Sequence, residues 1–156
     1  MSELPTDPSL RQMAEEIFSF TKDSWLARLA ARHQGEDQLS ETQFLTLDFL
    51  VGGGVPQTVG DIQRNIHVVP AQMSRIIRSL EGDFDSPLIR CELNQNDKRK
   101  IDVFLTEEGH KAHSDFLSDR LERTCRILAG IPEKDRLEFV RICSVMRTST
   151  DKPDNS

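Results

Sequence analysis

The chain has 156 residues, 37% of them hydrophobic, and a formal net charge of -6 at pH 7. This length suits one domain with a buried core, and no run of about 18 apolar residues is present to span a membrane. The acidic N-terminus carries no apolar signal segment and the three cysteines form no CxxC pair. We therefore expect a cytoplasmic protein that has no disulfide framework and does not enter a membrane.

The first part of the chain predicts two helices. Asp7-Pro8 is typical of a helix start, and apolar residues at helical spacing continue to about residue 33. After a polar break, Ser40 and Gln43 form a capping-box pattern that begins a second helix. The glycines at 52–54 are expected to end it.

The next segment has the pattern of a helix-turn-helix. Thr58 is predicted to cap a short helix, and Pro70 to begin another over about residues 70–82. The second helix has one apolar stripe, and its opposite face is polar and basic. Two such helices joined by a tight turn are typical of DNA-binding proteins. The apolar stripe is Met73, Ile76, Ile77 and Leu80, and the outward residues are Ala71, Gln72, Ser74, Arg75 and Arg78.

A β-hairpin is predicted over about residues 88–105. Ile101, Val103 and Leu105 alternate as in a half-buried strand, and the basic segment 97–100 lies in the turn. Thr106 is expected to cap the helix that follows. A cationic hairpin tip beside a cationic helix would contact nucleic acid at two places.

The C-terminal part predicts two further helices, separated by Gly130 and Pro132. The last helix is apolar over more than half of its circumference, so it needs more than one partner. We expect dimerisation helices over 8–33 and 106–148, with burial inside one monomer as the alternative. Residues 149–156 are predicted to form a disordered tail.

The distribution of charge matters more here than the net charge. From Ile62 to Leu80 the chain contains three arginines and no acidic residue, and residues 98–100 form a second basic cluster. Within a Debye length of about 8–10 Å, these local charges outweigh acidic residues elsewhere. Charge alone would equally suit a solvated basic surface without a partner.

These features resemble the MarR family of bacterial winged helix-turn-helix transcriptional regulators, by motif from about Ser40 to Gly109. The most specific match is the wing pattern Asp97-Lys98-Arg99, followed by Leu-Thr-x-x-Gly over residues 105–109. The resemblance implies one domain over 1–156 that is mainly α with a small β-hairpin wing. In it, a winged helix-turn-helix over 40–105 is flanked by dimerisation helices. Residues 82–87 depart from the family pattern because this turn is longer and more acidic than usual.

The resemblance also implies which residues contact DNA. Family members are dimers that place one recognition helix per subunit in successive major grooves and a wing arginine in the adjacent minor groove. Arg99 would then enter the minor groove, oriented by Asp97 through a charge-assisted hydrogen bond. Three helix residues, Gln72, Ser74 and Arg75, would face the major groove. The expected set is completed by Ala71 and by the phosphate-contacting Arg78, Lys98 and Lys100.

Members of the family commonly release DNA when a small anionic or phenolic molecule binds between the dimer helices and the DNA-binding part. From the order of the predicted helices, such a pocket in this chain would be lined by Trp25, Leu29, Phe44, Leu47 and Phe116. Each of these residues also fits an ordinary core position, which is the more common role of such side chains.

Two other kinds of signal remain open at this point. His110 and His113 are spaced i, i+3 and, with His33, form a weak candidate for a zinc site, so no metal is predicted. Cys91 lies beside a cationic arginine, which would lower its pKa and favour oxidation. Cys125 and Cys143 lie nearer to where redox-sensing relatives carry their cysteine, in a helix near the dimer interface. Both also fit the role of small buried hydrophobic residues.

The leading prediction is therefore a homodimeric, sequence-specific regulator that binds a pseudo-palindromic operator in double-stranded DNA. We expect a repressor that is released by a small-molecule, redox or metal signal. The alternative is a winged-helix module that binds a protein instead of DNA, which the negative net charge and the acidic segment 81–85 favour. No enzyme activity or cofactor is predicted, because no catalytic triad spacing or phosphate-binding loop is recognisable.

Overall fold

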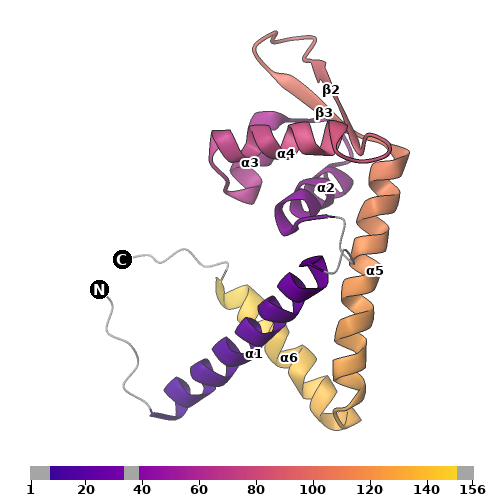
Figure 1. Ribbon diagram of the computed structural model, residues 1–156. Helices are drawn as coiled ribbons and strands as arrows, with labels where there is room; N and C mark the ends of the chain where they lie inside the picture. The colour runs from indigo at the N-terminus through magenta and orange to yellow at the C-terminus, as the bar shows by residue number, and fades with distance from the viewer. Residues whose placement is uncertain (1–7, 34–38, 151–156) are drawn as a thin grey trace, which may run out of the picture.

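The computed structural model describes residues 8–33 and 39–150 of the chain. It is mainly α with a small antiparallel sheet, as predicted. Figure 1 shows the helix-turn-helix and the hairpin gathered at one end, α1 and α6 at the other, and α5 connecting the two ends. The elements are α1 (Pro8–His33), α2 (Glu41–Gly53), β1 (Gln57–Thr58), α3 (Val59–Ile66), α4 (Pro70–Gly82), β2 (Ile89–Leu93), β3 (Ile101–Leu105), α5 (Glu107–Ala129) and α6 (Glu133–Thr150).

The predicted caps at Ser40 and Thr58 are confirmed, whereas Asp7, predicted before the first helix, lies outside the described residues. Ser40 Oγ accepts a hydrogen bond from the backbone N–H of Gln43, whose side-chain oxygen accepts from the N–H of Ser40. Thr58 and Asp61 make the same reciprocal pair at the start of α3. These bonds satisfy amide groups that have no partner within the helix, so the sequence itself sets where α2 and α3 begin.

The hydrophobic core lies beneath the helix-turn-helix and the sheet. The predicted apolar stripe of α4 is buried and packs in the same cluster as side chains from α2, α3, β2 and β3. This packing holds α4 and the hairpin in one rigid unit, because protein interiors are close-packed and resist displacement. The most deeply buried apolar members are Leu47, Ile62, Met73, Leu80, Ile89 and Val103.

The three strands form a sheet in the order β1-β3-β2. β2 and β3 are the predicted hairpin, with Ile89 opposite Leu105 and Leu93 opposite Ile101. β1 was not predicted, because two residues are too short to establish an alternating pattern. It pairs with β3 through Gln57 and Thr58, so the hairpin is anchored directly to the residue that caps α3.

Gly109 explains the Leu-Thr-x-x-Gly motif in physical terms. A Cβ at this position would lie 2.1 Å from the carbonyl oxygen of Leu88, so only glycine fits without displacement. The same carbonyl accepts a hydrogen bond from the N–H of Thr106 at 3.1 Å, and Thr106 Oγ1 donates to the carbonyl of Pro87 at 2.7 Å. The motif therefore fixes the base of the hairpin against the start of α5.

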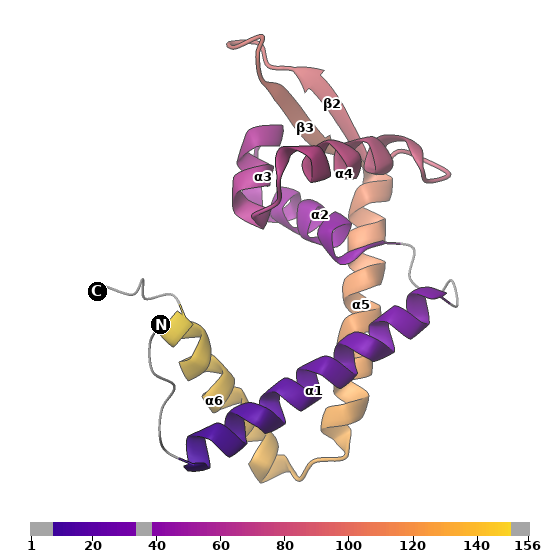
Figure 2. The ribbon, with the colours of Figure 1, turned by 60° about the vertical axis from the view of Figure 1, so that its left-hand side comes forward.

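The helices at the other end of the molecule expose many apolar side chains, and Figure 2 shows α1 and α6 standing apart from the helix-turn-helix. Helix α6 continues to Thr150, so residues 149 and 150 are helical and not part of a tail. The rest of the predicted tail, 151–156, lies outside the described residues. No described helix combines the length and apolar character that crossing a bilayer requires.

Candidate nucleic-acid interface

Helix α4 presents one continuous polar and basic surface. Its buried stripe is no more than 9% exposed, whereas Ala71, Gln72, Ser74, Arg75 and Arg78 are all exposed. Within the described part of the chain, the side chains of Gln72 and Arg75 make no hydrogen bond or ion pair, so their polar groups can bind an outside partner. Arg78 donates from Nε to the carbonyl of Ser74 at 3.1 Å, which directs its guanidinium along the helix.

The turn between α3 and α4 is built by two local features. His67 ends α3 in the left-handed conformation, with a φ of 54°. Val69 precedes α4 without a side-chain cap, and Pro70 occupies the first turn, where its missing N–H costs nothing. The first amides of α4 are therefore not occupied by a side-chain cap.

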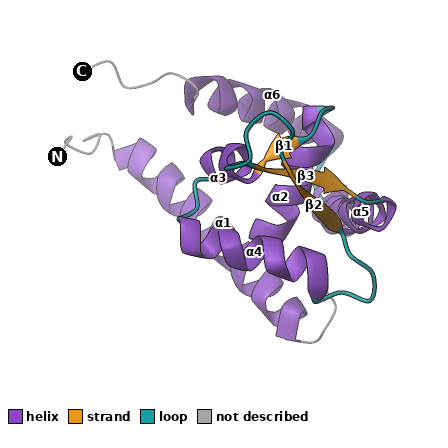
Figure 3. Ribbon diagram, turned by 90° about the horizontal axis from the view of Figure 1, so that it is seen from above, coloured by secondary structure: helices purple, strands orange, loops and turns teal. Residues whose placement is uncertain are grey.

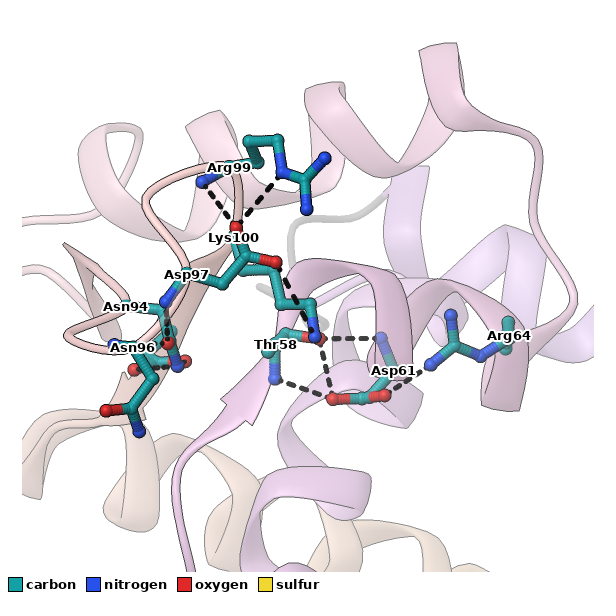
Figure 4. Close-up of polar contacts among 9 residues, drawn as sticks. Thr58, Asp61, Arg64, Asn94, Asn96, Asp97, Arg99 and Lys100 are labelled. Atoms are coloured by element: carbon teal, nitrogen blue, oxygen red, sulfur yellow. Dashed lines mark hydrogen bonds and ion pairs between the residues drawn. The ribbon is translucent and has the colours of Figure 1, made fainter.

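The hairpin tip is organised by its own side chains, as Figure 4 shows. Asn94 Oδ1 accepts hydrogen bonds from the backbone N–H groups of Asn96 and Asp97, each at 2.9 Å. Asp97 Oδ1 in turn accepts from the backbone N–H of Arg99 at 3.1 Å and from its Nε at 3.2 Å. The predicted charge-assisted contact between Asp97 and Arg99 is therefore present.

Arg99 is held and exposed at the same time. Its side chain is 91% exposed although Nε is bonded to Asp97. Because the hydrogen bonds from Arg99 stabilise the carboxylate, and Lys100 adds a favourable charge, the pKa of Asp97 lies below its usual value. The terminal nitrogens of the guanidinium remain directed away from Asp97 (Figure 4).

Lys100 connects the hairpin with the start of α3. Its Nζ lies 3.9 Å from Asp97 Oδ2, and it also contributes to the lowered pKa of Asp61, whose largest cause is the hydrogen bond from Thr58. Asp61 also pairs with Arg64, so Lys100 and Arg64 place positive charge on either side of Asp61 (Figure 4). Arg64 was not among the predicted contacts, although it lies in the acid-free segment of the sequence.

The charged side chains on the two strands of the hairpin have partners within it, and Asp102 accepts hydrogen bonds from Asn94 Nδ2. Arg90 lies over the ring of Phe104, 5.0 Å from its centroid, and its Nε is 3.3 Å from Glu92. Glu92 stands opposite Asp102 across the strands. This side of the hairpin is therefore not strongly basic, and positive charge is concentrated at the tip.

The acidic connection between α4 and β2 lies away from the tip. Asp83 and Asp85 are exposed in this segment. Figures 2 and 3 show it running past the start of α5, on a different side of the molecule from the turn of the hairpin. These carboxylates therefore do not adjoin the basic tip of the hairpin.

The five residues predicted to line a pocket do not form one group. Leu47 and Phe116 belong to the core, and Phe44 stacks on Phe116 with ring centroids 4.5 Å apart. Trp25 and Leu29 lie on α1 and are 54% and 38% exposed, so they form surface rather than a lining of that cluster. Both residues have the helical spacing of core positions, but α1 does not pack against that cluster.

The histidine candidates separate in the same way. His113 is buried: its ring stacks on Phe44 and its Nε2 lies 2.8 Å from Asp48 Oδ1. His113 therefore faces α2, whereas His110 is exposed, and the two side chains do not share one surface. The side chain of His33 lies outside the described residues. Among the residues described, no three His, Cys, Asp or Glu side chains are grouped as a metal site requires.

The predicted reactivity of Cys91 is wrong. Burial and the neighbouring carboxyl of Glu81 raise the pKa of its thiol to about 12. Arg90 does not counteract this, because its guanidinium is engaged by Phe104 and Glu92. Of the other cysteines, Cys125 is exposed and Cys143 is half-buried.

The whole arrangement is similar to solved structures of bacterial proteins. They include the YusO protein from Bacillus subtilis, with 21% identity and a TM-score of 0.74 over 93% of this chain and 99% of that one. A MarR family protein from Bacillus stearothermophilus has 15% identity and a TM-score of 0.72 over 91% and 97%. FabT from Streptococcus pneumoniae, in complex with DNA, has 15% identity and a TM-score of 0.70 over 91% and 97%.

No protein-family model matches the chain, and no curated protein matches it. At these identities the structural likeness establishes the fold. The chain therefore has the MarR-type winged helix-turn-helix fold, in which α3 and α4 form the helix-turn-helix and β2–β3 form the wing.

Proposed function

We propose that this chain is a MarR-type transcriptional regulator that binds double-stranded DNA as a homodimer. The proposal rests on two exposed basic features that lie at the same end of one rigid unit. One is the outer face of α4, and the other is the hairpin tip on which Asp97 holds Arg99. Two contacts with a fixed separation determine both the position and the orientation of a protein on a duplex.

Helix α4 supplies the contacts that read sequence in this proposal. Gln72 can form a bidentate pair with adenine, and Arg75 with guanine, and both side chains lack internal partners within the described residues. Ser74 lies on the same exposed face and can bond to either kind of base. Arg78 is better suited to phosphate, because its Nε is already bonded to the helix backbone.

The hairpin tip supplies the minor-groove contact. A narrow minor groove at A·T-rich sequences concentrates negative potential and attracts an inserted arginine. Arg99 suits this role because Asp97 orients its guanidinium before DNA arrives, which lowers the entropy lost on binding. Lys98 and Lys100 flank it and would pair with phosphates on either side of the groove.

The apolar surface of α1 and α6 supports the homodimer. Eight large apolar side chains of α1 and six of α6 are exposed. Covering what remains exposed on them would contribute on the order of 10–20 kcal/mol, which matches or exceeds the roughly 4–15 kcal/mol that association costs. A symmetric dimer built in this way presents two copies of α4, so we expect half-sites about one helical turn apart.

The finer parts of the proposal are a repressor role and release from DNA by an effector. The alternative of a protein-binding module has less support, because the acidic connection after α4 is remote from the wing tip and leaves the basic surface unobstructed. The DNA-selection experiment described next distinguishes DNA binding from protein binding.

The test begins with selection of bound sequences from random double-stranded DNA by the full-length protein. Affinity for the selected site is then measured by fluorescence anisotropy for wild type, Arg99→Ala and Arg126→Ala. Arg126 is an exposed arginine in the last turn of α5, far from the wing, so its change controls for net charge. We expect Arg99→Ala to weaken binding about tenfold or more, mostly at A·T-rich sites. Failure to select any sequence, or equal affinities for the two variants, would refute the proposal.

A further inference from the structure

A cavity of about 480 Å³ lies between the α4–β2 connection and the first half of α5. Its floor is apolar, because Leu39, Leu88 and Phe116 are buried core residues that line it. Phe84, from the connection, adds a half-buried aromatic wall. The volume falls within the roughly 300–1,000 Å³ of small-molecule sites. None of the residues proposed to read DNA lines this cavity.

The rim of the cavity is acidic. Asp85 comes from the connection, and Glu108, Asp115 and Asp119 come from α5, where their spacing of seven and then four residues sets them along one helix face. Lys111 is the one cationic residue among the described residues of the lining. Within the described residues none of the four carboxylates has a hydrogen-bond or ion-pair partner.

This combination determines the charge of a suitable ligand. Asp115 and Asp119 stand at i, i+4, where like charges repel, and a bound cation would relieve that repulsion. An anionic ligand would add to it. The carboxylates are nevertheless too dispersed for a metal ion, since no described group of three acidic, histidine or cysteine side chains converges as a metal requires.

We propose that this cavity binds an aromatic organic cation. Its flat apolar body would lie on Leu88 and against Phe84, and its ammonium group would lie among Asp85, Asp115 and Asp119. The apolar floor gives affinity for the aromatic part, and the unpaired carboxylates give charge selectivity through charge-assisted hydrogen bonds.

The position of the cavity gives such a ligand a route to the DNA-binding surface. Residues 85–88 connect α4 to β2, and the backbone of Leu88 is bonded both to Leu80 in α4 and to Thr106 at the start of α5. A ligand that contacts this segment therefore touches the connection between the recognition helix and the wing. This consequence rests on the proposed function, whereas ligand binding itself does not.

The test uses the full-length protein without DNA, so it can fail while DNA binding stands, and the reverse. Isothermal titration calorimetry at pH 7 compares three probes with one aromatic body: 1-naphthylmethylamine, neutral 1-naphthalenemethanol and anionic 1-naphthoate. We expect the amine to bind about tenfold or more tightly than the alcohol, as one charge-assisted contact would give. The naphthoate should bind more weakly than the alcohol.

Variants locate the site. The double change Asp115→Asn and Asp119→Asn should reduce amine affinity about tenfold and leave the alcohol unaffected. Glu122→Gln makes a comparable change at an exposed position of α5 outside the cavity and should have no effect. Asp85→Asn, in the connection, gives a second variant that does not alter a helix. Equal affinities for amine and alcohol, tighter binding of naphthoate, or unchanged amine binding in the cavity variants would overturn the proposal.

Discussion

Replacing Gly109 with alanine tests how firmly the hairpin is fixed to α5. The new Cβ would meet Leu88 O at 2.1 Å, Leu105 Cδ1 at 2.7 Å and the carbonyl carbon of Leu88 at 3.0 Å. The backbone must therefore move by about 1 Å to restore ordinary contact. Such overpacking costs about 1–3 kcal/mol, and loss of the bond from Thr106 N to Leu88 O adds about 1 kcal/mol. The better helix propensity of alanine offsets about 1 kcal/mol of this.

The expected net effect is a destabilisation of about 1–3 kcal/mol, which lowers the melting temperature by roughly 3–10 °C for a domain of this size. Urea denaturation at fixed protein concentration measures it directly. Gly52→Ala is the matched control, because a Cβ there meets nothing within 4 Å and no positive φ is required. The control should be neutral or slightly stabilising. If Gly109→Ala is as stable as Gly52→Ala, the close packing of the hairpin base against α5 is refuted.

Three further predictions concern other regions. The pKa of Asp97, measured by NMR, should lie below the unperturbed value of about 3.9 and rise in Arg99→Ala. Because the pKa is lowered in the folded state, the ion pair stabilises the tip fully above the unfolded-state pKa, and this stabilisation is lost as pH falls through the folded-state pKa. An unchanged pKa of Asp97 in the variant would contradict the pairing. Cys91 should react with iodoacetamide at pH 8 much more slowly than exposed Cys125, and comparable rates would show that burial and Glu81 do not suppress its thiolate. Val140→Asp on α6 should shift the protein towards monomer in sedimentation analysis, whereas an unchanged dimer would remove α6 from the interface.

The sequence predicted those features that depend on local chemistry. Ser40, Thr58 and Thr106 cap helices because their side-chain oxygens can reach an amide three residues ahead, which is a property of a few adjacent residues. The buried face of α4 was also predicted, because its four apolar residues at helical spacing lie on one side of the helix. The contact between Asp97 and Arg99 followed from the family pattern and two residues of separation.

Features that depend on packing between distant segments were missed. The same apolar spacing buries residues in α4 and leaves Trp25 exposed in α1, because only the fold decides which helix has a neighbour. His113 is buried because it stacks on Phe44 and contacts the carboxylate of Asp48, both in α2, and Asp48 is 65 residues away in the sequence. The raised pKa of Cys91 depends on Glu81, which approaches it across the turn from α4 to β2, and not on its sequence neighbour. The acidic cavity likewise combines residues from segments that precede and follow the hairpin in the chain.

The salt dependence of DNA binding tests the central claim most directly. If α4 and the wing of each subunit neutralise about 6–10 phosphates in total, affinity for the selected site should fall by roughly 10³–10⁵ between about 50 and 200 mM salt. Lys98→Ala, at a residue proposed to pair with phosphate, should make the plot of log affinity against log salt concentration less steep. Its slope should fall by about 1 for each phosphate that is no longer neutralised. A DNA affinity that does not change with salt, or a slope unchanged in Lys98→Ala, would contradict the view that local basic charge on this acidic protein binds a duplex.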